Sequence, residues 1–251
     1  MTEALGGRWP VTVLASVGST NEAAKGAART LPIQPQWIRA EEQTAGRGRQ
    51  GRSWASPQGN LYATALFPLE GGYGDALQVP FIAALTVAET VERLAPGSEP
   101  KLKWPNDVRV EGQKLSGILI ESGVTDGAFW VVAGIGMNIS AIPEAVDQAA
   151  TSIAALRGDT LIDAAMAMDL LASGFASHMQ RLPGGFEPVR QAWLQRAEGL
   201  GETIRVRSGP GDSYQSGAFE DMGPDGSLIL RLPDGARQTI RAGDVELVRQ
   251  A

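Results

Sequence analysis

Hydrophobic positions along the chain follow two different periods, and the change falls near residue 200. Before that point, apolar residues recur every three to four positions in three stretches, which predicts helices over 81–94, 161–182 and 186–197. After it, short alternating stretches are separated by Pro-Asp-Gly turns at 224–226 and 233–235. The pattern predicts a mixed α+β domain at 1–200 and a small all-β domain at 201–251.

Short apolar or alternating runs between the helices predict the strands of the first domain, at 11–16, 37–42, 61–67, 101–104, 115–121 and 129–138. A short helix is expected directly after Ser19, because Ser19 and Glu22 have the spacing of a capping box. Five strands are expected in the second domain, at 203–207, 215–219, 227–232, 238–241 and 245–249. Strands this short with tight turns are typical of a small β-barrel.

Composition excludes several kinds of chemistry. The chain has 251 residues, no cysteine and one histidine, His178. Thiol nucleophiles, disulfides and cysteine-based zinc sites are therefore excluded. A Ser-His-Asp triad or a multi-histidine metal site would depend on one imidazole. The chemistry must use Lys, Arg, carboxylates, hydroxyls, amides, backbone N–H groups or a bound hard cation.

The net charge of −6 makes general binding to nucleic acid unfavourable, because phosphate contacts need a positive surface. The N-terminal ten residues lack the pattern of a signal peptide, and no apolar run reaches about 18 residues. We expect a cytoplasmic protein without a membrane span. Only Lys25, Lys101, Lys103 and Lys114 are lysines, and the grouping of the last three suggests a local requirement.

The segment 46–52 holds three glycines and three arginines in seven residues. Glycine lets the backbone approach a ligand closely, and arginine binds phosphate or carboxylate oxygens with two parallel hydrogen bonds. The segment is a candidate anion-binding loop. Taken alone, it could equally be a solvated basic turn or an RNA contact.

Three further segments are candidate parts of a site. Asn106 and Asp107 present an amide and a carboxylate in a turn after Pro105, Lys114 lies at the start of an apolar strand, and Gly134 and Gly136 interrupt a buried strand. Separately, these could be an ordinary Asx turn, a strand-end lysine and a β-bulge or close backbone approach. No GxGxxG or Walker A motif is present, which argues against Rossmann and P-loop sites.

In order and spacing, these segments together resemble the biotin–protein ligase family over nearly the whole chain. The resemblance rests on the five segments Ser19–Asn21, Gln43–Trp54, Lys103–Asp107, Gly112–Glu121 and Gly134–Asn138. It implies a class II synthetase-like catalytic domain with a mixed sheet, followed by an SH3-like β-barrel. It also implies that ATP and biotin give biotinyl-5′-adenylate, with Mg²⁺, and that biotin passes to a lysine of a biotin carboxyl carrier protein of acetyl-CoA carboxylase.

The resemblance also assigns roles to individual residues. Lys114, Arg47, Arg49 and Asp107 are implied as catalytic, with Asp107 orienting or deprotonating the carrier lysine. Biotin is implied to contact Ser19, Thr20, Asn21, Gln43, Arg47, Gly48, Arg49, Lys114 and Gly117. ATP is implied to contact Arg49, Trp54, Asn106, Lys114 and Asn138, with Trp54 stacking on adenine. No metal ligands are assigned.

The sequence departs from family patterns at Gln50, where some members carry a basic residue, and Ser19 is too close to the start for a preceding helix-turn-helix domain. We therefore expect a ligase that does not bind an operator, as a monomer or homodimer. Two alternatives are a lipoate- or octanoyl-transferring enzyme on the same fold and a non-enzymatic nucleic-acid-binding module. The arginine-rich loop and the lack of cysteine argue against the first, and the overall acidity argues against the second.

Overall fold

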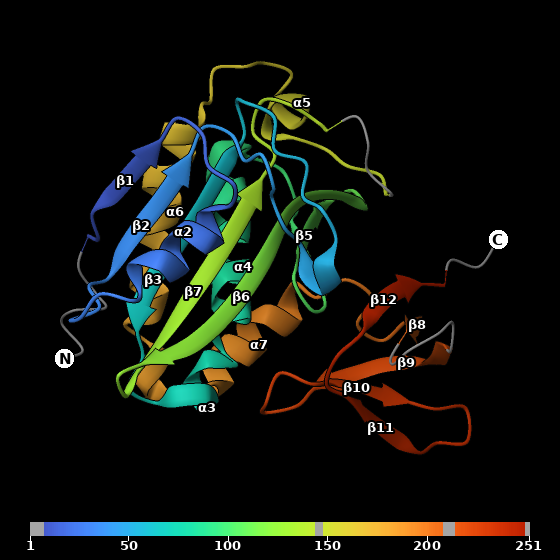
Figure 1. Cartoon of the computed structure of the whole chain (residues 1–251). Coiled ribbons are helices and arrows are strands. Elements are labelled where there is room, and N and C mark those ends of the chain that lie inside the picture. Colours follow the sequence, from blue (N-terminus) through green and yellow to red (C-terminus); the bar gives the residue numbers. More distant parts are fainter. Residues whose placement is uncertain (1–7, 144–147, 208–213, 249–251) are drawn as a thin grey trace.

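A seven-stranded sheet forms the centre of the larger part of the protein (Figure 1). The computed structural model describes residues 8–143, 148–207 and 214–248. The strands are β1 (Val11–Leu14), β2 (Gln36–Ala40), β3 (Leu61–Pro68), β4 (Lys101–Lys103), β5 (Asp107–Val110), β6 (Gln113–Thr125) and β7 (Ala128–Met137). Their order is β1-β2-β3-β7-β6-β5-β4. β1 and β2 are parallel and the other neighbours are antiparallel, so the sheet is mixed.

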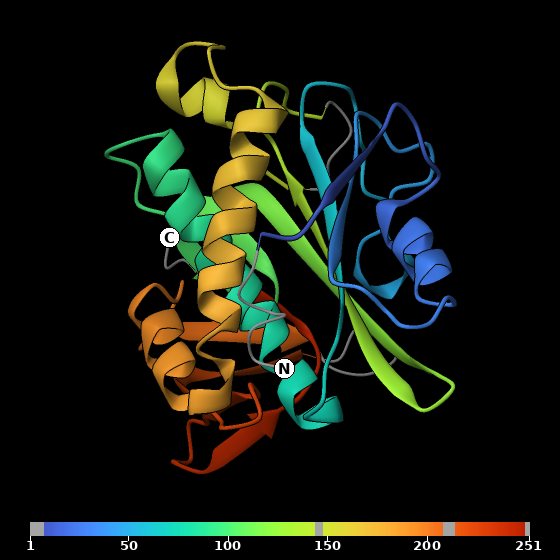
Figure 2. The same cartoon turned by 90° about the vertical axis from the view of Figure 1, so that its left-hand side faces the viewer.

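Helices cover both faces of this sheet (Figure 2). On one face lie α4 (Val79–Leu94) and α6 (Ala164–Met179), and on the other lies α2 (Thr20–Ala27). The remaining helical elements are α3 (Gly72–Ala76), α5 (Ile153–Arg157), α7 (Glu187–Gln195) and the 3-10 turns η1 (Arg49–Gly51) and η2 (Leu182–Gly184). Because α2 packs on β2, β3 and β7, its N-terminal residues lie over the middle of the sheet.

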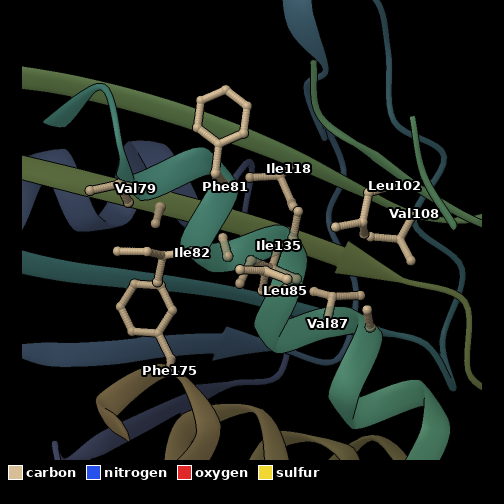
Figure 3. Close-up of a cluster of buried hydrophobic side chains, with 14 of the residues drawn as sticks. Val79, Phe81, Ile82, Leu85, Val87, Leu102, Val108, Ile118, Ile135 and Phe175 are labelled. Atoms are coloured by element: carbon tan, nitrogen blue, oxygen red, sulfur yellow. The ribbon is translucent and has the colours of Figure 1, made fainter. Parts of the chain in front are cut away.

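The main hydrophobic core lies between the sheet and α4 with α6. Figure 3 shows α4 side chains packed with Phe175 of α6 and with Ile118 and Ile135 of the sheet. Phe175 is fully buried, and its ring lies 5.4 Å from that of Trp37 and 5.9 Å from those of Trp9 and Phe67. This core makes the sheet a rigid base for the residues on its opposite face.

The C-terminal residues form a second, antiparallel sheet of β8 (Thr203–Arg207), β9 (Tyr214–Met222), β10 (Leu228–Arg231), β11 (Arg237–Ile240) and β12 (Asp244–Leu247). Its order is β11-β10-β9-β8-β12. The turn before β10 fixes it to the larger part of the protein: the Trp104 indole N–H donates to the Gly226 carbonyl at 2.9 Å. A Cβ on Gly226 would lie 2.3 Å from the Phe81 ring, so this contact requires glycine.

The predicted α+β class, with a small all-β part at the C-terminus, is confirmed. The predicted helices correspond to α2, α4, α6 and α7, and Asp126 and Gly127 adopt positive φ in the turn between β6 and β7. The boundary at residue 200 stays a prediction. Part of the N-terminal stretch used to argue against a signal peptide, and the end of the strand expected at 245–249, lie outside the described residues.

The helix expected directly after Ser19 is confirmed as α2, and the local structure differs from the expectations in three details. Within the described residues, the Ser19 side chain makes no capping hydrogen bond, although Ser19 does have an extended backbone at the start of α2. Asp107 is the first residue of β5 and only Asn106 lies in the turn. The helices α3 and α5 were not expected, because each is only five residues long and cannot show a helical period.

Candidate functional site

One cavity of about 550 Å³ brings together all thirteen residues implied by the sequence. They are Ser19, Thr20, Asn21, Gln43, Arg47, Gly48, Arg49, Trp54, Asn106, Asp107, Lys114, Gly117 and Asn138. The cavity lies on the face of the sheet that also carries α2, so that the polar start of α2 and the strands β5, β6 and β7 border it. A volume of this size suits a small-molecule site.

The start of α2 is held over the sheet by a network of buried polar groups. Gln43 Oε1 accepts from the Thr20 backbone N–H at 2.9 Å and lies 3.1 Å from Thr20 Oγ1. Thr64 Oγ1 lies 2.7 Å from Asn21 Oδ1, and because Oδ1 can only accept, Thr64 donates there. Asn21 Nδ2 donates to Leu119 O and to Glu121 Oε2, at 3.2 and 2.9 Å. Both polar atoms of the Asn21 side chain, Oδ1 and Nδ2, are therefore hydrogen-bonded and fix the wall of the cavity.

Gly134 has a steric role beneath this network. A Cβ on Gly134 would lie 2.1 Å from Asn21 Oδ1. The pairing of β7 with β3 and β6 is regular on either side of Gly134. The sequence left open whether Gly134 marks a β-bulge or a close approach to the backbone. The regular strand pairing and the short distance to Asn21 show a close approach.

The Trp54 indole lies against a second glycine position, the cross-strand pair Gly117 and Gly136. A Cβ on Gly136 would lie 2.6 Å from the indole and one on Gly117 would lie 2.9 Å from it. Lys114 Nζ is 5.3 Å from the centre of the ring, within the range of a cation–π contact. Among the described residues, the buried indole N–H has no hydrogen-bond partner. Stacking of Trp54 on adenine stays a prediction.

A nearly buried ion pair joins Lys114 and Asp107, two of the four residues implied as catalytic. Lys114 Nζ lies 2.7 Å from Asp107 Oδ1, and the side chains are 17% and 14% exposed. Asn106 stands beside them, with its Nδ2 donating to Ile118 O at 2.8 Å and its Oδ1 accepting from Arg49 at 3.4 Å. Low exposure makes the charges strong toward a ligand, because less water screens them.

The arginines of the 46–52 loop point to different partners. Arg47 pairs with Glu22 of α2 at 2.7 Å. Arg49 is largely buried and donates to Gly243 O at 3.3 Å, which connects the loop to the C-terminal sheet. The Lys25 hydrogen bond, and the charges of Lys25 and Arg47, keep the pKa of the Glu22 carboxyl below its usual range.

The Asn138 side chain is buried at the end of β7. Its Nδ2 donates to the Thr151 carbonyl at 3.0 Å and so holds the segment after β7 against the cavity. Its role toward ATP stays a prediction, as do the ligand contacts of the other residues.

Several residues that line the cavity are not among the thirteen that the sequence resemblance implies. Lys103 belongs to the lysine group that the sequence singled out, and burial lowers its pKa although Asp107 opposes this. Tyr62 also lines the cavity, and burial raises its pKa to about 12. Arg207 and Asp244 come from the C-terminal sheet. Sequence patterns could not have found these two, because they lie far along the chain from the loop they meet.

The described side chains of the cavity do not form a metal site by themselves. Within the described residues, no three His, Cys, Asp or Glu side chains gather in a way that could hold a metal ion. Three described carboxylates line the cavity: Asp107 and Asp244 are paired with cations, and Glu246 accepts a hydrogen bond from the Tyr214 hydroxyl at 3.3 Å. The Mg²⁺ implied by the resemblance stays a prediction.

Known proteins share both parts of this architecture. A family described as "Biotin/lipoate A/B protein ligase family" matches residues 13–138, and "Biotin protein ligase C terminal domain" matches 199–248. A biotin–[acetyl-CoA-carboxylase] ligase from Paracoccus denitrificans is 41% identical over 240 residues, which are 93% of this chain and 98% of the relative. The chain belongs to the biotin–protein ligase family.

Solved structures of biotin–protein ligases agree with this assignment. The ligase from Aquifex aeolicus in complex with biotin and ATP has a TM-score of 0.79 and 26% identity, with 96% of this chain and 99% of that chain covered. The ligase from Leishmania major with biotinyl-5-AMP has a TM-score of 0.66 and 26% identity, covering 93% and 99%. The predicted family is thus confirmed. In the described part of the chain, no helix has both the length and the apolar character to cross a membrane.

Proposed function

We propose that this protein joins biotin to ATP, giving biotinyl-5′-adenylate and pyrophosphate, and then transfers biotin to a lysine of a biotin carboxyl carrier protein. The proposal rests mainly on the Lys114–Asp107 pair, which lies in one cavity with Arg49 and Trp54. The cations of the cavity can bind the biotin carboxylate and a phosphate of ATP. The Asp107 carboxylate can bind the amine of the carrier lysine.

The biotin end of the cavity is assigned to the start of α2. Ser19, Thr20 and Gln43 border it with hydroxyl and amide groups, which suit the ureido ring of biotin. Asn21 acts mainly by holding the wall, since its amide is already fully hydrogen-bonded. The glycines beneath leave the sheet surface open for a flat ligand.

In the first step, a biotin carboxylate oxygen attacks the α-phosphorus of ATP, an O–P bond forms, and the bond to the β-phosphate oxygen breaks. Both reactants are anions, so their approach needs compensation by positive charge. Lys114, Arg47 and Arg49 supply it and stabilise the charge that gathers on the phosphorus oxygens. Positioning the two substrates side by side supplies much of the remaining rate enhancement.

In the second step, the carrier lysine attacks the carbonyl carbon of the mixed anhydride, and AMP leaves as the C–O bond breaks. The attacking nitrogen must lose a proton. We assign to Asp107 the role of orienting the amine or accepting that proton, which its place in the cavity supports. No covalent enzyme intermediate is needed, in agreement with the absence of cysteine.

Biotin-dependent ATP–pyrophosphate exchange tests the proposal. The purified protein with ATP and Mg²⁺ should exchange labelled pyrophosphate only when biotin is added. Lipoate and octanoate in place of biotin test the related acyl-transfer activity, and should give no exchange. Absence of exchange with biotin, or equal exchange with lipoate, would overturn the proposal.

Lys114→Ala should abolish exchange, and Lys101→Ala is the matched control. Both changes remove one positive charge, but Lys101 is exposed on β4 and does not line the cavity. Loss of the ion pair leaves the Asp107 charge poorly solvated, so Lys114→Ala should also melt at a lower temperature. Biotin transfer to the carrier by Lys114→Ala at the unaltered rate would remove Lys114 from the mechanism.

A further inference from the structure

Glu22 of α2 belongs to a chain of charged groups that runs along the outside of the cavity. Glu22 Oε1 lies 2.7 Å from Arg47 Nη1 of the arginine-rich loop and 2.7 Å from Lys25 Nζ of α2. Lys25 Nζ also lies 2.7 Å from Glu121 Oε1 of β6, and Glu121 Oε2 accepts from Asn21 Nδ2 at 2.9 Å. Arg47 and Asn21 line the cavity, whereas the other three side chains do not. The chain therefore joins the loop to the wall of the cavity from outside.

Neither Glu22 nor Lys25 has a role in the site as the sequence predicts it. The spacing suggests that Glu22 forms a capping box with Ser19, but within the described residues the Ser19 side chain makes no capping hydrogen bond. Lys25 stands apart from the group formed by the other three lysines. In the structure, the Lys25 ammonium instead holds two carboxylates together, one from α2 and one from β6.

The arginine-rich loop is held by ion pairs on two sides. A bridge between Arg47 and Ser53 closes it into a small hairpin. On one side, Arg52 lies 3.0 Å from Asp244 of the C-terminal sheet. On the other side, the ion pair between Arg47 and Glu22 ties the hairpin to α2. Without the Glu22 carboxylate, the hairpin loses its ion pair to α2 and keeps the one to the C-terminal sheet.

Lys25 restrains the Glu22 carboxylate at the place where Arg47 meets it. Burial lowers the pKa of Lys25, but its hydrogen bonds to Glu121 and Glu22 outweigh burial and keep the pKa above its usual range. Lys25 is thus a cation at neutral pH. Its side chain is 25% exposed and that of Glu121 is 33% exposed, so this end of the chain of charges is ordered. A network of charges with ordered members contributes more than an isolated surface ion pair.

The ion pair leaves Arg47 able to bind a ligand as well. Arg47 donates to Glu22 through Nη1, and a guanidinium carries five N–H groups. The remaining N–H groups can meet an anion in the cavity while Glu22 keeps the side chain in place. Because the Arg47 side chain is 57% exposed, it would sample several rotamers without this restraint.

We propose that Glu22, held in place by Lys25, positions Arg47 at the cavity and so slows the escape of bound biotinyl-5′-adenylate. Glu22 and Lys25 are positioning residues, because they act through Arg47 and their own side chains do not line the cavity. The inference rests on the proposed function, which supplies the ligand. It gives the outer face of α2 a part in retaining the reaction intermediate.

Release of radiolabelled biotinyl-5′-adenylate, added to the full chain as a prepared compound, measures this role without a catalytic step. Glu22→Gln keeps the size of the side chain and removes its charge. It should raise the release rate about fivefold, equivalent to about 1 kcal/mol. Glu42→Gln is the matched control, because it removes the same charge next to Gln43 and Glu42 does not line the cavity. An unchanged rate in Glu22→Gln, or an equal increase in Glu42→Gln, would overturn the proposal.

Two substitutions of Lys25 separate its charge from its packing. Lys25→Met keeps a long apolar side chain without the ammonium, and should raise the release rate about threefold. Lys25→Arg keeps a cation that can hold the two carboxylates, and should restore slow release. Equally fast release by both variants would overturn the role of Lys25.

A double-mutant cycle shows whether Glu22 acts through Arg47. In an Arg47→Gln background, Glu22→Gln should change the release rate less than about twofold, because the cation that Glu22 holds is already absent. A fivefold increase in that background would show that Glu22 acts independently of Arg47 and would contradict the proposal. If the unaltered protein does not retain the adenylate at all, the proposed function fails with it. Retention by the unaltered protein and an equal rate in Glu22→Gln would contradict the positioning role alone.

Discussion

Replacement of Gly134 by alanine tests the packing of α2 on the sheet. The added Cβ would lie 2.1 Å from Asn21 Oδ1, 2.9 Å from its Cγ and 3.1 Å from its Nδ2. Gly134 is in the centre of β7, hydrogen-bonded on both sides, so the backbone cannot move away easily. Asn21 must therefore leave its position.

The cost follows from the three hydrogen bonds that Asn21 makes. Two go to neutral partners, Thr64 and the Leu119 carbonyl, and one goes to the Glu121 carboxylate. A neutral hydrogen bond contributes about 0.5 to 1.5 kcal/mol and one to a charged group about 1.5 to 3 kcal/mol. Since neighbouring contributions are not additive, we expect a loss of about 2 to 4 kcal/mol in the free energy of unfolding. In a chain of this length, this corresponds to a melting temperature lower by on the order of 10 °C.

Thermal unfolding and biotin titration of Gly134→Ala check this reasoning. Biotin affinity should fall at least tenfold, because the displaced Asn21 disturbs the wall next to Ser19 and Thr20. The control is Gly26→Ala in α2, where a Cβ would meet nothing within 4 Å. Alanine there should be neutral or stabilising by up to about 1 kcal/mol. If Gly134→Ala melts and binds biotin like the unaltered protein, the close approach of Asn21 and β7 is not a constraint.

Three further predictions concern the core, pH and the loop. Phe175→Ala should lower the free energy of unfolding by about 3 to 5 kcal/mol, because it removes the ring that contacts Trp9, Trp37 and Phe67. Urea titrations measure this loss, and a loss below about 1 kcal/mol would contradict the reasoning. The ion pairs of Asp244 should stabilise the fold fully at pH values above 3.8, the ordinary pKa of an aspartate carboxyl. This stabilisation should be lost as the pH falls through the lower pKa that Asp244 has in the folded protein, because the carboxyl is then protonated. The melting-temperature difference from Asp244→Asn should therefore shrink below that pH, and a difference that grows would refute the sign. Arg47→Ala and Arg49→Ala should release biotinyl-5′-adenylate faster in a filter-retention assay, and unchanged retention in both would exclude the loop from holding it.

Much of the site could be predicted from local sequence, because each of its segments has a recognisable composition. Residue type and spacing alone mark the glycine- and arginine-rich loop, the Asn106-Asp107 pair and Lys114 as candidates, and all line one cavity. Helices α4 and α6 are long enough to show a clear period, and each has sixteen residues. Five-residue helices such as α3 carry no such signal, since one turn contains too few positions to define a face.

The roles of the glycines needed the three-dimensional structure. From sequence, Gly134 and Gly136 could have marked a bulge or a close approach, and only strand register and the positions of Asn21 and Trp54 distinguish the two. Local pattern likewise suggested a capping bond from Ser19. In the folded protein, the neighbouring Thr20 and Asn21 are instead fixed by partners from β3, β6 and the Gln43 segment.

By itself, the sequence determined the α+β class, the family resemblance and the side chains that can carry the chemistry, because periodicity and motifs are encoded in neighbouring residues. The tertiary structure decided which charges share a site. Asp244 meets Arg52 across 192 residues of chain, and no local pattern records a contact between two separate sheets. Packing of the C-terminal sheet through Trp104 and Gly226 brings these groups together.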